Sequence, residues 1–158
     1  MENKKTENRK TVVISPYSRR LRNGKNNAKN YCFWPQLIDM LIKKGYDVIQ
    51  LGVADEKKFS GAKEMKYNLK LKEIKALVLS ADLWISVDNF LPHFLAETKK
   101  PGIVLWGRSD PEIYGYPHNI NLLKDKKYLR EDQYNIWEAI EFDPTVFVPP
   151  AEVISYIK

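Results

Sequence analysis

Cysteine and histidine are scarce in this sequence of 158 residues, which limits the chemistry that it can support. Cys32 is the single cysteine, so no disulfide can form within the chain, and His93 and His118 are its two histidines. The usual Cys/His zinc spacings cannot be built from this set. We therefore expect no metal site and no bound cofactor.

Long apolar runs are also missing. No apolar stretch reaches the roughly 18 residues that a membrane helix needs, and the first ten residues, M-E-N-K-K-T-E-N-R-K, contain no apolar segment typical of a secretory signal. We expect a cytoplasmic protein without a membrane span. The length suits one domain, residues 11–158, after a basic polar tail, residues 1–10.

Acidic residues are rare at the start of the chain. Residues 1–30 hold nine Lys/Arg and two Asp/Glu, or 9 − 2 = +7, whereas the remainder holds 17 and 18, or −1. A nucleic-acid binder usually spreads its cations over a face, so this distribution favours a compact anionic ligand. A nucleic-acid-associated protein stays an alternative, and residues 4–10 could equally be a solvated tail.

Three common catalytic or nucleotide-binding motifs are absent. The sequence has no G-x-x-x-x-G-K-[ST], no G-x-G-x-x-G and no G-x-S-x-G, so ATPase, dinucleotide-binding and serine-hydrolase functions lack their usual support.

Short apolar strands alternate with amphipathic helices along the chain. We therefore predict a Rossmann-like three-layer α/β/α fold with a mostly parallel sheet. The expected strands are 11–15, 47–51, a short 68–70, 83–87, 102–106 and 119–123, and the expected helices are 33–44, 71–81, 90–100, 134–141 and 151–157.

The junction at the end of the strand 83–87 is the first candidate binding region. Asp88 and Asn89 offer an N-cap to the next helix, and Pro92 suits its first turn. Ligands of open α/β sheets collect at such junctions, where helix N-H groups meet the carboxyl ends of the strands. Asp88, Asn89 and His93 are thus candidates, although Asp88 could be a plain cap and His93 a packed side chain.

A basic loop at residues 16–31 is the second candidate region. It contains Arg and Lys but no acidic residue, and loops of this length in a compact domain are usually functional or disordered. We expect its cations to lack partners in the free protein, the loop to close over a bound diphosphate, and Lys29→Ala to leave stability nearly unchanged.

Three segments follow one another along the chain: W-P-Q-L-I-D-M-L-I-K-K-G-Y-D-V-I-Q-L-G, then L-K-E-I-K-A-L-V-L-S-A-D-L-W-I-S-V-D-N-F-L-P-H-F-L-A, then K-K-P-G-I-V-L-W-G-R-S-D-P. In this order they resemble glycosyltransferase family 9, the heptosyltransferase-like enzymes. The resemblance covers residues 11 to about 124 and corresponds to the C-terminal, nucleotide-sugar-binding half of a two-domain GT-B enzyme. It implies that this chain is a single GT-B half.

The resemblance also implies roles for particular residues. The family pattern D-[ST]-G-x-x-H-[LIF]-A, which holds a diphosphate, is matched by Asp88 and His93, whereas Asn89 replaces Ser/Thr and Phe90 replaces Gly. The family's phosphate-neutralising cation corresponds to Lys29, with Lys25 as the alternative. Its ribose-binding acid corresponds to Glu56, with Asp55 next, although Glu56 could also be a solvated loop acid.

The sequence thus predicts a glycosyltransferase-like protein that binds a nucleotide diphosphate sugar as donor substrate. Metal-independent transfer would require a second domain, a partner chain or a homodimer to complete the cleft, because the family's general base lies in the acceptor domain. A non-catalytic nucleotide-binding or interaction module is the alternative, so no catalytic residue is assigned. The candidate ligand-binding residues are Ser15, Tyr17, Ser18, Arg19, Lys25, Lys29, Glu56, Asp88, Asn89 and His93.

Overall fold

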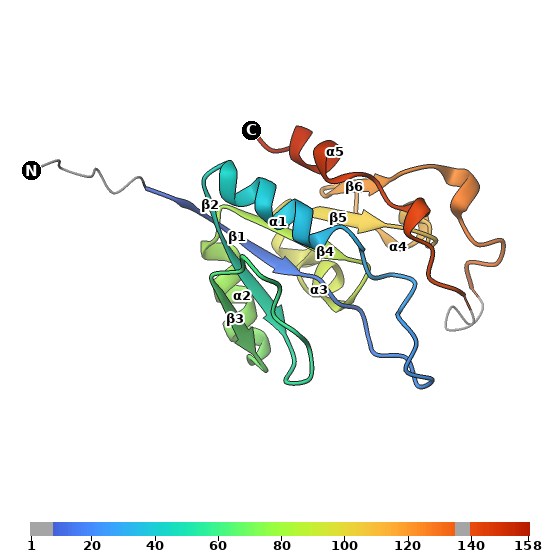
Figure 1. The fold of residues 1–158 in the computed structure, drawn as a ribbon, viewed down its shortest axis with the longest axis horizontal. Helices are drawn as coiled ribbons and strands as arrows, with labels where there is room; N and C mark the ends of the chain where they lie inside the picture. Colours follow the sequence, from blue (N-terminus) through green and yellow to red (C-terminus); the bar gives the residue numbers. More distant parts are fainter. Residues whose placement is uncertain (1–7, 135–139) are drawn as a thin grey trace, which may run out of the picture.

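Six parallel strands form the central sheet of the chain. In the computed structural model, which describes residues 8–134 and 140–158, their order is β3-β2-β1-β4-β5-β6. The strands are β1 Lys10–Ser15, β2 Tyr46–Gly52, β3 Glu64–Tyr67, β4 Leu83–Val87, β5 Ile103–Trp106 and β6 Ile120–Leu123. The chain builds outward from β1 to β3 and then resumes at β4 on the other side of β1, so the order reverses between β1 and β4 (Figure 1).

Helices cover both faces of this sheet, as the sequence predicted (Figure 1). The helices α1, Trp34–Lys43, and α5, Pro150–Ser155, pack on one face, and α2, Leu71–Ser80, and α3, Phe90–Phe94, pack on the other. Shorter elements are α4 Pro111–Tyr114 and the 3-10 turns η1 Ala96–Thr98, η2 Lys126–Tyr128 and η4 Pro144–Val146.

Successive side chains of β1 point alternately into the two hydrophobic cores. Val12 and Ile14 face the layer that contains α1, whereas Val13 faces the layer that contains α2, and all three are fully buried. Because successive strand residues point to opposite faces, a strand buried on both sides reads as one continuous apolar run. This explains why the sequence T-V-V-I-S marked the central strand clearly.

Three tryptophans belong to these cores, as expected from the sequence. Trp34, Trp84 and Trp106 are at most 1% exposed. Trp84 in β4 packs directly against the backbone at Gly102, where an added Cβ would lie 2.0 Å from the indole ring. Its Nε1 donates to the Lys100 carbonyl at 3.2 Å. A larger residue at position 102 would therefore displace the Trp84 ring.

Two expected elements differ in position or length. The third strand is β3 at Glu64–Tyr67, not residues 68–70, and its side chains are half-buried or exposed, so no apolar run marked it. The helix after β4 ends at Phe94 and is followed by η1, after which Lys99 adopts a left-handed φ of 59°. Phe90, the first residue of this helix, is 48% exposed, whereas Leu91 is buried.

The two ends of the chain also refine the prediction. The expected helix near residues 134–141 falls largely on residues 135–139, which lie outside the described residues. Arg9 was assigned to the polar tail, but its guanidinium bonds Asp47 at 2.8 Å and the carbonyls of Ile42 and Tyr46. The packed domain therefore begins at least as early as Arg9.

Within the described ranges, no helix is long and apolar enough to cross a bilayer.

Trp84→Ala should lower the free energy of unfolding by about 3 to 5 kcal/mol, because it leaves a large cavity between the sheet and α2. Leu79→Ala is the matched control, since Leu79 on α2 is 45% exposed, and it should change stability by less than about 0.5 kcal/mol. Chemical denaturation of both variants is the measurement, and equal losses would contradict this assignment of the core.

Candidate functional site

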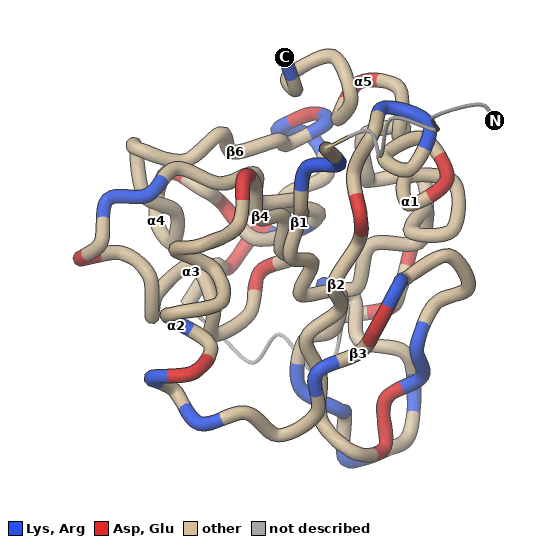
Figure 2. Tube along the Cα trace, turned by 90° about the vertical axis from the view of Figure 1, so that its left-hand side faces the viewer, with Lys and Arg blue, Asp and Glu red and all other residues tan. Residues whose placement is uncertain are grey.

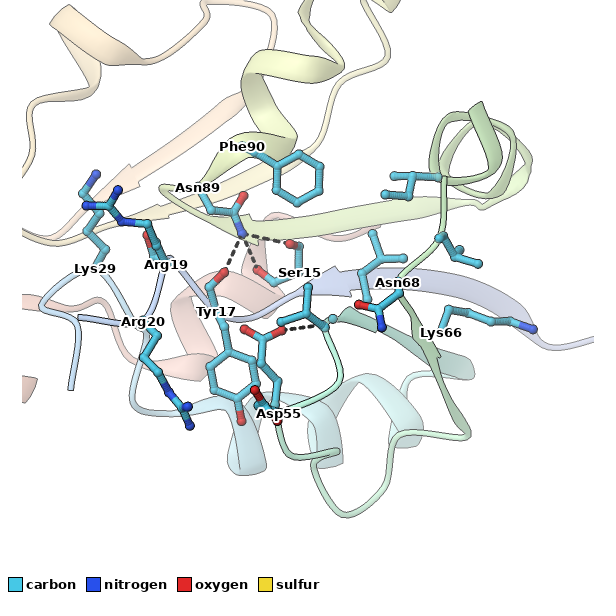
Figure 3. Close-up of a pocket in the computed structure, with 17 residues that line it drawn as sticks. Ser15, Tyr17, Arg19, Arg20, Lys29, Asp55, Lys66, Asn68, Asn89 and Phe90 are labelled. Atoms are coloured by element: carbon cyan, nitrogen blue, oxygen red, sulfur yellow. Dashed lines mark hydrogen bonds between the residues drawn. The ribbon is translucent and has the colours of Figure 1, made fainter. Parts of the chain in front are cut away.

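A cavity of about 650 Å³ lies at the carboxyl ends of β1, β2 and β4 (Figure 3). This is the edge of a parallel sheet next to its switch in strand order, where α/β proteins usually bind ligands. The cavity brings together seven residues expected from the sequence, which come from three separate segments: Ser15, Tyr17, Ser18, Arg19, Lys29, Glu56 and Asn89.

Asn89 holds the ends of β1 and β4 together beneath this cavity. Its Nδ2 donates to the Ser15 hydroxyl at 2.8 Å, to the Ser15 carbonyl at 3.3 Å and to the Tyr17 carbonyl at 3.1 Å. Its Oδ1 accepts from the Leu91 N-H at 2.9 Å and from the Ser86 hydroxyl at 2.9 Å. Asn89 is therefore the N-cap of α3, and it also fixes the start of the basic loop.

Asp88 has a different role from the cap considered for it. Its side chain is 9% exposed and forms an ion pair with Lys29 at 3.1 Å. Lys29 lines both the main cavity and a much smaller neighbouring cavity, whereas Asp88 lines the smaller one alone. The expectation that the loop cations lack partners is thus wrong for Lys29, because a buried carboxylate already neutralises it.

The basic loop is held in place by its own polar side chains. Asn27 donates from Nδ2 to the Arg19 carbonyl at 2.7 Å and accepts from the Lys29 N-H at 2.9 Å. Asn30 accepts from the Ser18 N-H at 2.8 Å. The loop also buries Leu21 and Ala28, so its backbone has a defined path over the end of the sheet.

Tyr31, at the C-terminal end of this loop, bonds to the C-terminal part of the chain. The ring is 3% exposed, and its hydroxyl donates to the Val148 carbonyl at 2.7 Å. Burial raises the pKa of Tyr31 far above its usual value, so the hydroxyl stays protonated and remains a donor. Sixteen residues of loop are therefore anchored at both ends, by Asn89 and by Tyr31.

The cavity carries carboxylates and cations on different segments. Glu56 follows β2 and accepts from the Val53 N-H at 2.8 Å through one carboxylate oxygen. Burial raises the pKa of Glu56, while the Val53 N-H and the positive charge of Arg20 act in the opposite direction. Gly52 leaves room for this arrangement, since an added Cβ would lie 2.9 Å from the Glu56 oxygen.

Three expected residues do not line the main cavity: Asp88, which lines the smaller one, and His93 and Lys25. His93 is exposed on α3, and its Nδ1 lies 2.9 Å from the Tyr116 hydroxyl, with the two rings in an edge-on arrangement. Lys25 lies on an exposed turn, where its N-H donates to the Asn23 side chain at 2.9 Å. Of the two alternatives for the phosphate-neutralising cation, the structure thus brings Lys29 into the cavity and leaves Lys25 outside.

Several cavity residues were missed or ranked second in the sequence. The resemblance gave Asp55 only as an alternative, and Phe90 only as a departure from the family pattern. The lining residues not assigned from the sequence also include Arg20, Val53, Lys66, Asn68, Leu69 and Ile74. Most belong to the segment from β2 to α2. Because the third strand was predicted at the wrong residues, the sequence did not indicate which residues of this segment reach the carboxyl edge of the sheet.

The sequence matches glycosyltransferase family 9 (heptosyltransferase) over residues 1–130. The chain belongs to this family. No curated protein matches the sequence significantly. Family membership agrees with the resemblance of the three segments and with the strand order of the sheet.

Solved structures of heptosyltransferases share this fold. The ADP-heptose LPS heptosyltransferase II of E. coli is 17% identical with a TM-score of 0.59, and the match covers 89% of this chain and 44% of that one. TibC from enterotoxigenic E. coli H10407 is 20% identical with a TM-score of 0.61, covering 90% of this chain and 37% of TibC. TibC in complex with ADP-D-β-D-heptose gives 19% identity, a TM-score of 0.59 and coverage of 89% and 35%.

This chain thus spans less than half the length of those structures. TibC is described as iron-containing and dodecameric. Among residues 8–134 and 140–158 here, no three His, Cys, Asp or Glu side chains come together in a way that could hold a metal. The described part of this family member therefore offers no ligand set for such an ion.

Asn89→Ala should lower the free energy of unfolding by about 2 to 3 kcal/mol, because it removes a cap and leaves the buried Ser15 groups without their donor. Asn89→Asp separates the two roles, since it keeps the cap oxygen but loses the amide donor. If Asn89 were only a cap, Asn89→Asp would be as stable as wild type in thermal melts, whereas we expect it to be clearly destabilised.

Lys29→Ala should also reduce stability, by about 2 kcal/mol, because it leaves the buried Asp88 carboxylate without its counter-ion. The double variant Lys29→Ala with Asp88→Asn should recover most of this loss. A double-mutant cycle by chemical denaturation measures the coupling. A coupling energy near zero would show that the pair contributes nothing to the folded state.

Proposed function

We propose that this chain binds a nucleotide diphosphate sugar in the cavity at the carboxyl edge of the sheet. The observation that carries the proposal is the distribution of charge around one cavity: Arg19, Arg20 and Lys29 of the basic loop line it together with Asp55 and Glu56, which follow β2. Cations suit the diphosphate, and a carboxylate suits sugar hydroxyl groups.

Glu56 is the residue that we assign to the ribose of this ligand. One of its oxygens is held by the Val53 N-H, which fixes the orientation of the carboxylate. Its other oxygen is then available to accept a hydrogen bond from a hydroxyl. An acceptor that is fixed in position before binding reduces the entropic cost of association.

Transfer from this ligand would not need a divalent metal. A leaving diphosphate requires positive charge, and the loop cations supply it without a metal ion. The five-residue helix α3 contributes less than the sequence suggested, because a short helix has a weak dipole and Asn89 already occupies the Leu91 N-H. The positive charge therefore rests mainly on Arg19 and Arg20, because Asp88 already neutralises Lys29.

Complete glycosyl transfer also requires an acceptor site and a general base. We propose that a further domain, a partner chain or a second copy supplies them across the open side of the cavity. A non-catalytic nucleotide-binding module is the second candidate. Turnover with added acceptors separates the two, since a binder that neither hydrolyses nor transfers the sugar supports the module.

The charge distribution does not favour nucleic acid as the partner. Lys and Arg positions are interspersed with Asp and Glu positions in the view of Figure 2, with no continuous basic face there. A gel shift at about 50 mM salt tests this alternative.

Isothermal titration with ADP-, UDP- and GDP-sugars, with and without magnesium, tests the binding proposal. We expect one class of nucleotide sugar to bind with the same affinity in both conditions, and with lower affinity as salt increases. Arg20→Ala should weaken binding about tenfold, which corresponds to the loss of one charge-assisted contact. Absence of binding at millimolar ligand would refute the proposal.

Glu56→Gln should weaken binding by about 10- to 100-fold, because an amide is a poorer acceptor than a carboxylate for the ribose hydroxyl. The same substitution should not lower the free energy of unfolding at pH 7. The pKa of Glu56 is raised in the folded state, so folding favours the protonated form, and ionisation costs stability as the pH rises from the ordinary carboxyl value through the folded value.

Thermal melts at two pH values measure this second effect. At pH 7 the Glu56→Gln variant should be at least as stable as wild type, and its advantage should vanish at about pH 3.5, where both side chains are neutral. A variant less stable than wild type at pH 7 would show that Glu56 has a mainly structural role.

A further inference from the structure

An exposed aromatic ring forms one wall of the cavity. Phe90, the first residue of α3, is 48% exposed and lines the cavity, and its ring leans on Phe94 with centroids 6.5 Å apart. The same cavity is lined by Val53, which is 55% exposed, and by Leu69 and Ile74. Exposed apolar groups that gather around a concave site commonly mark a place where a ligand is bound.

Asn68 is an uncharged polar residue on this side of the cavity. Its backbone has a left-handed φ of 50°, and its N-H donates to the Gly52 carbonyl at 3.0 Å, so the end of β2 fixes its position. Among the described residues, none bonds the Asn68 carboxamide. Asn89 differs in this respect, because the bonds described above use both its oxygen and its nitrogen.

The cavity therefore has two chemically different ends. In Figure 3 Arg19 and Lys29 lie at one end, Asn68 lies at the other, and Phe90 lies between them on one wall. Lys66 also lies at the Asn68 end, but its Nζ pairs with Glu64 at 3.1 Å, which leaves less of its charge for a ligand. A ligand that spans the cavity would place its anionic part near Arg19 and its uncharged part near Asn68.

We propose that Phe90 and Asn68 form the nucleobase site of this cavity, with the ring of Phe90 stacked on the base and the carboxamide of Asn68 bonded to the base edge. The inference rests on the proposed function and adds the residues that determine base preference. A flat aromatic base covers the exposed ring and gains stacking energy whatever its identity. The paired donor and acceptor of a carboxamide can instead discriminate between base edges.

Phe90→Ala tests the stacking contact. Titrations of ADP, GDP, UDP and CDP should each lose affinity on the order of tenfold, whereas inorganic diphosphate, which has no base, should bind as it does to wild type. Phe90→Tyr should retain nucleotide affinity. Tyr156→Ala is the matched control, since Tyr156 is also 48% exposed but is the C-cap that follows α5 and does not line the cavity. Equal losses for diphosphate and nucleotides, or no loss for nucleotides, would overturn the assignment of Phe90.

Asn68→Gly tests the edge contact. Glycine removes the carboxamide and tolerates the left-handed φ, so the backbone is preserved. The differences in Kd among the four nucleoside diphosphates should shrink in this variant, and Asn68→Asp, which loses the amide donors, should change their rank order. An unchanged spread and order in both variants would overturn the role of Asn68.

The wild-type titrations keep this inference separate from the proposed function. If wild type binds none of the four nucleotides, the proposed function itself fails, and the inference fails with it. If wild type binds them and the Phe90 and Asn68 variants bind equally well, only the inference fails, and the base must contact other residues.

Discussion

The carboxamide of Asn89 is the contact on which the binding edge of this protein depends. The strand order of the parallel sheet reverses between β1 and β4, so the carboxyl ends of these two strands lie side by side. The segments that follow them run in different directions. Asn89 bonds the end of β1 through its nitrogen and the start of α3 through its oxygen. One side chain thus sets the starting point of the basic loop, the position of Phe90 and the floor of the cavity.

Some charged side chains at this edge form ion pairs within the protein, and others are exposed at the cavity. Lys29 is neutralised by the buried Asp88, which holds the loop against the end of β4. Burial disfavours the charged form of Glu56. Arg19 and Arg20 are exposed at the edge of the cavity, where an anion can reach them.

This chain keeps the spacing of the family pattern but has different residue types at two of its positions. Asn89 stands where the family has Ser or Thr, and the larger carboxamide reaches across to Ser15 and Tyr17, which makes it a clamp as well as a cap. Phe90 stands where the family has Gly, and its ring occupies the wall of the cavity instead of leaving the backbone open.

Much of the fold was determined by the sequence alone, because each buried strand or amphipathic helix carries its own apolar pattern. Residues 11–15, 83–87 and 71–81 were identified in this way, and the resemblance of three segments indicated the family. The edge strand β3 was misplaced because its half-buried residues E-M-K-Y carry no such run. Only the tertiary structure decided which side chains meet: that Lys29 bonds Asp88, that His93 turns to Tyr116 outside the cavity, and that Asn68 and Phe90 line one cavity. These pairings join segments tens of residues apart, and local periodicity contains no information about distance across a sheet.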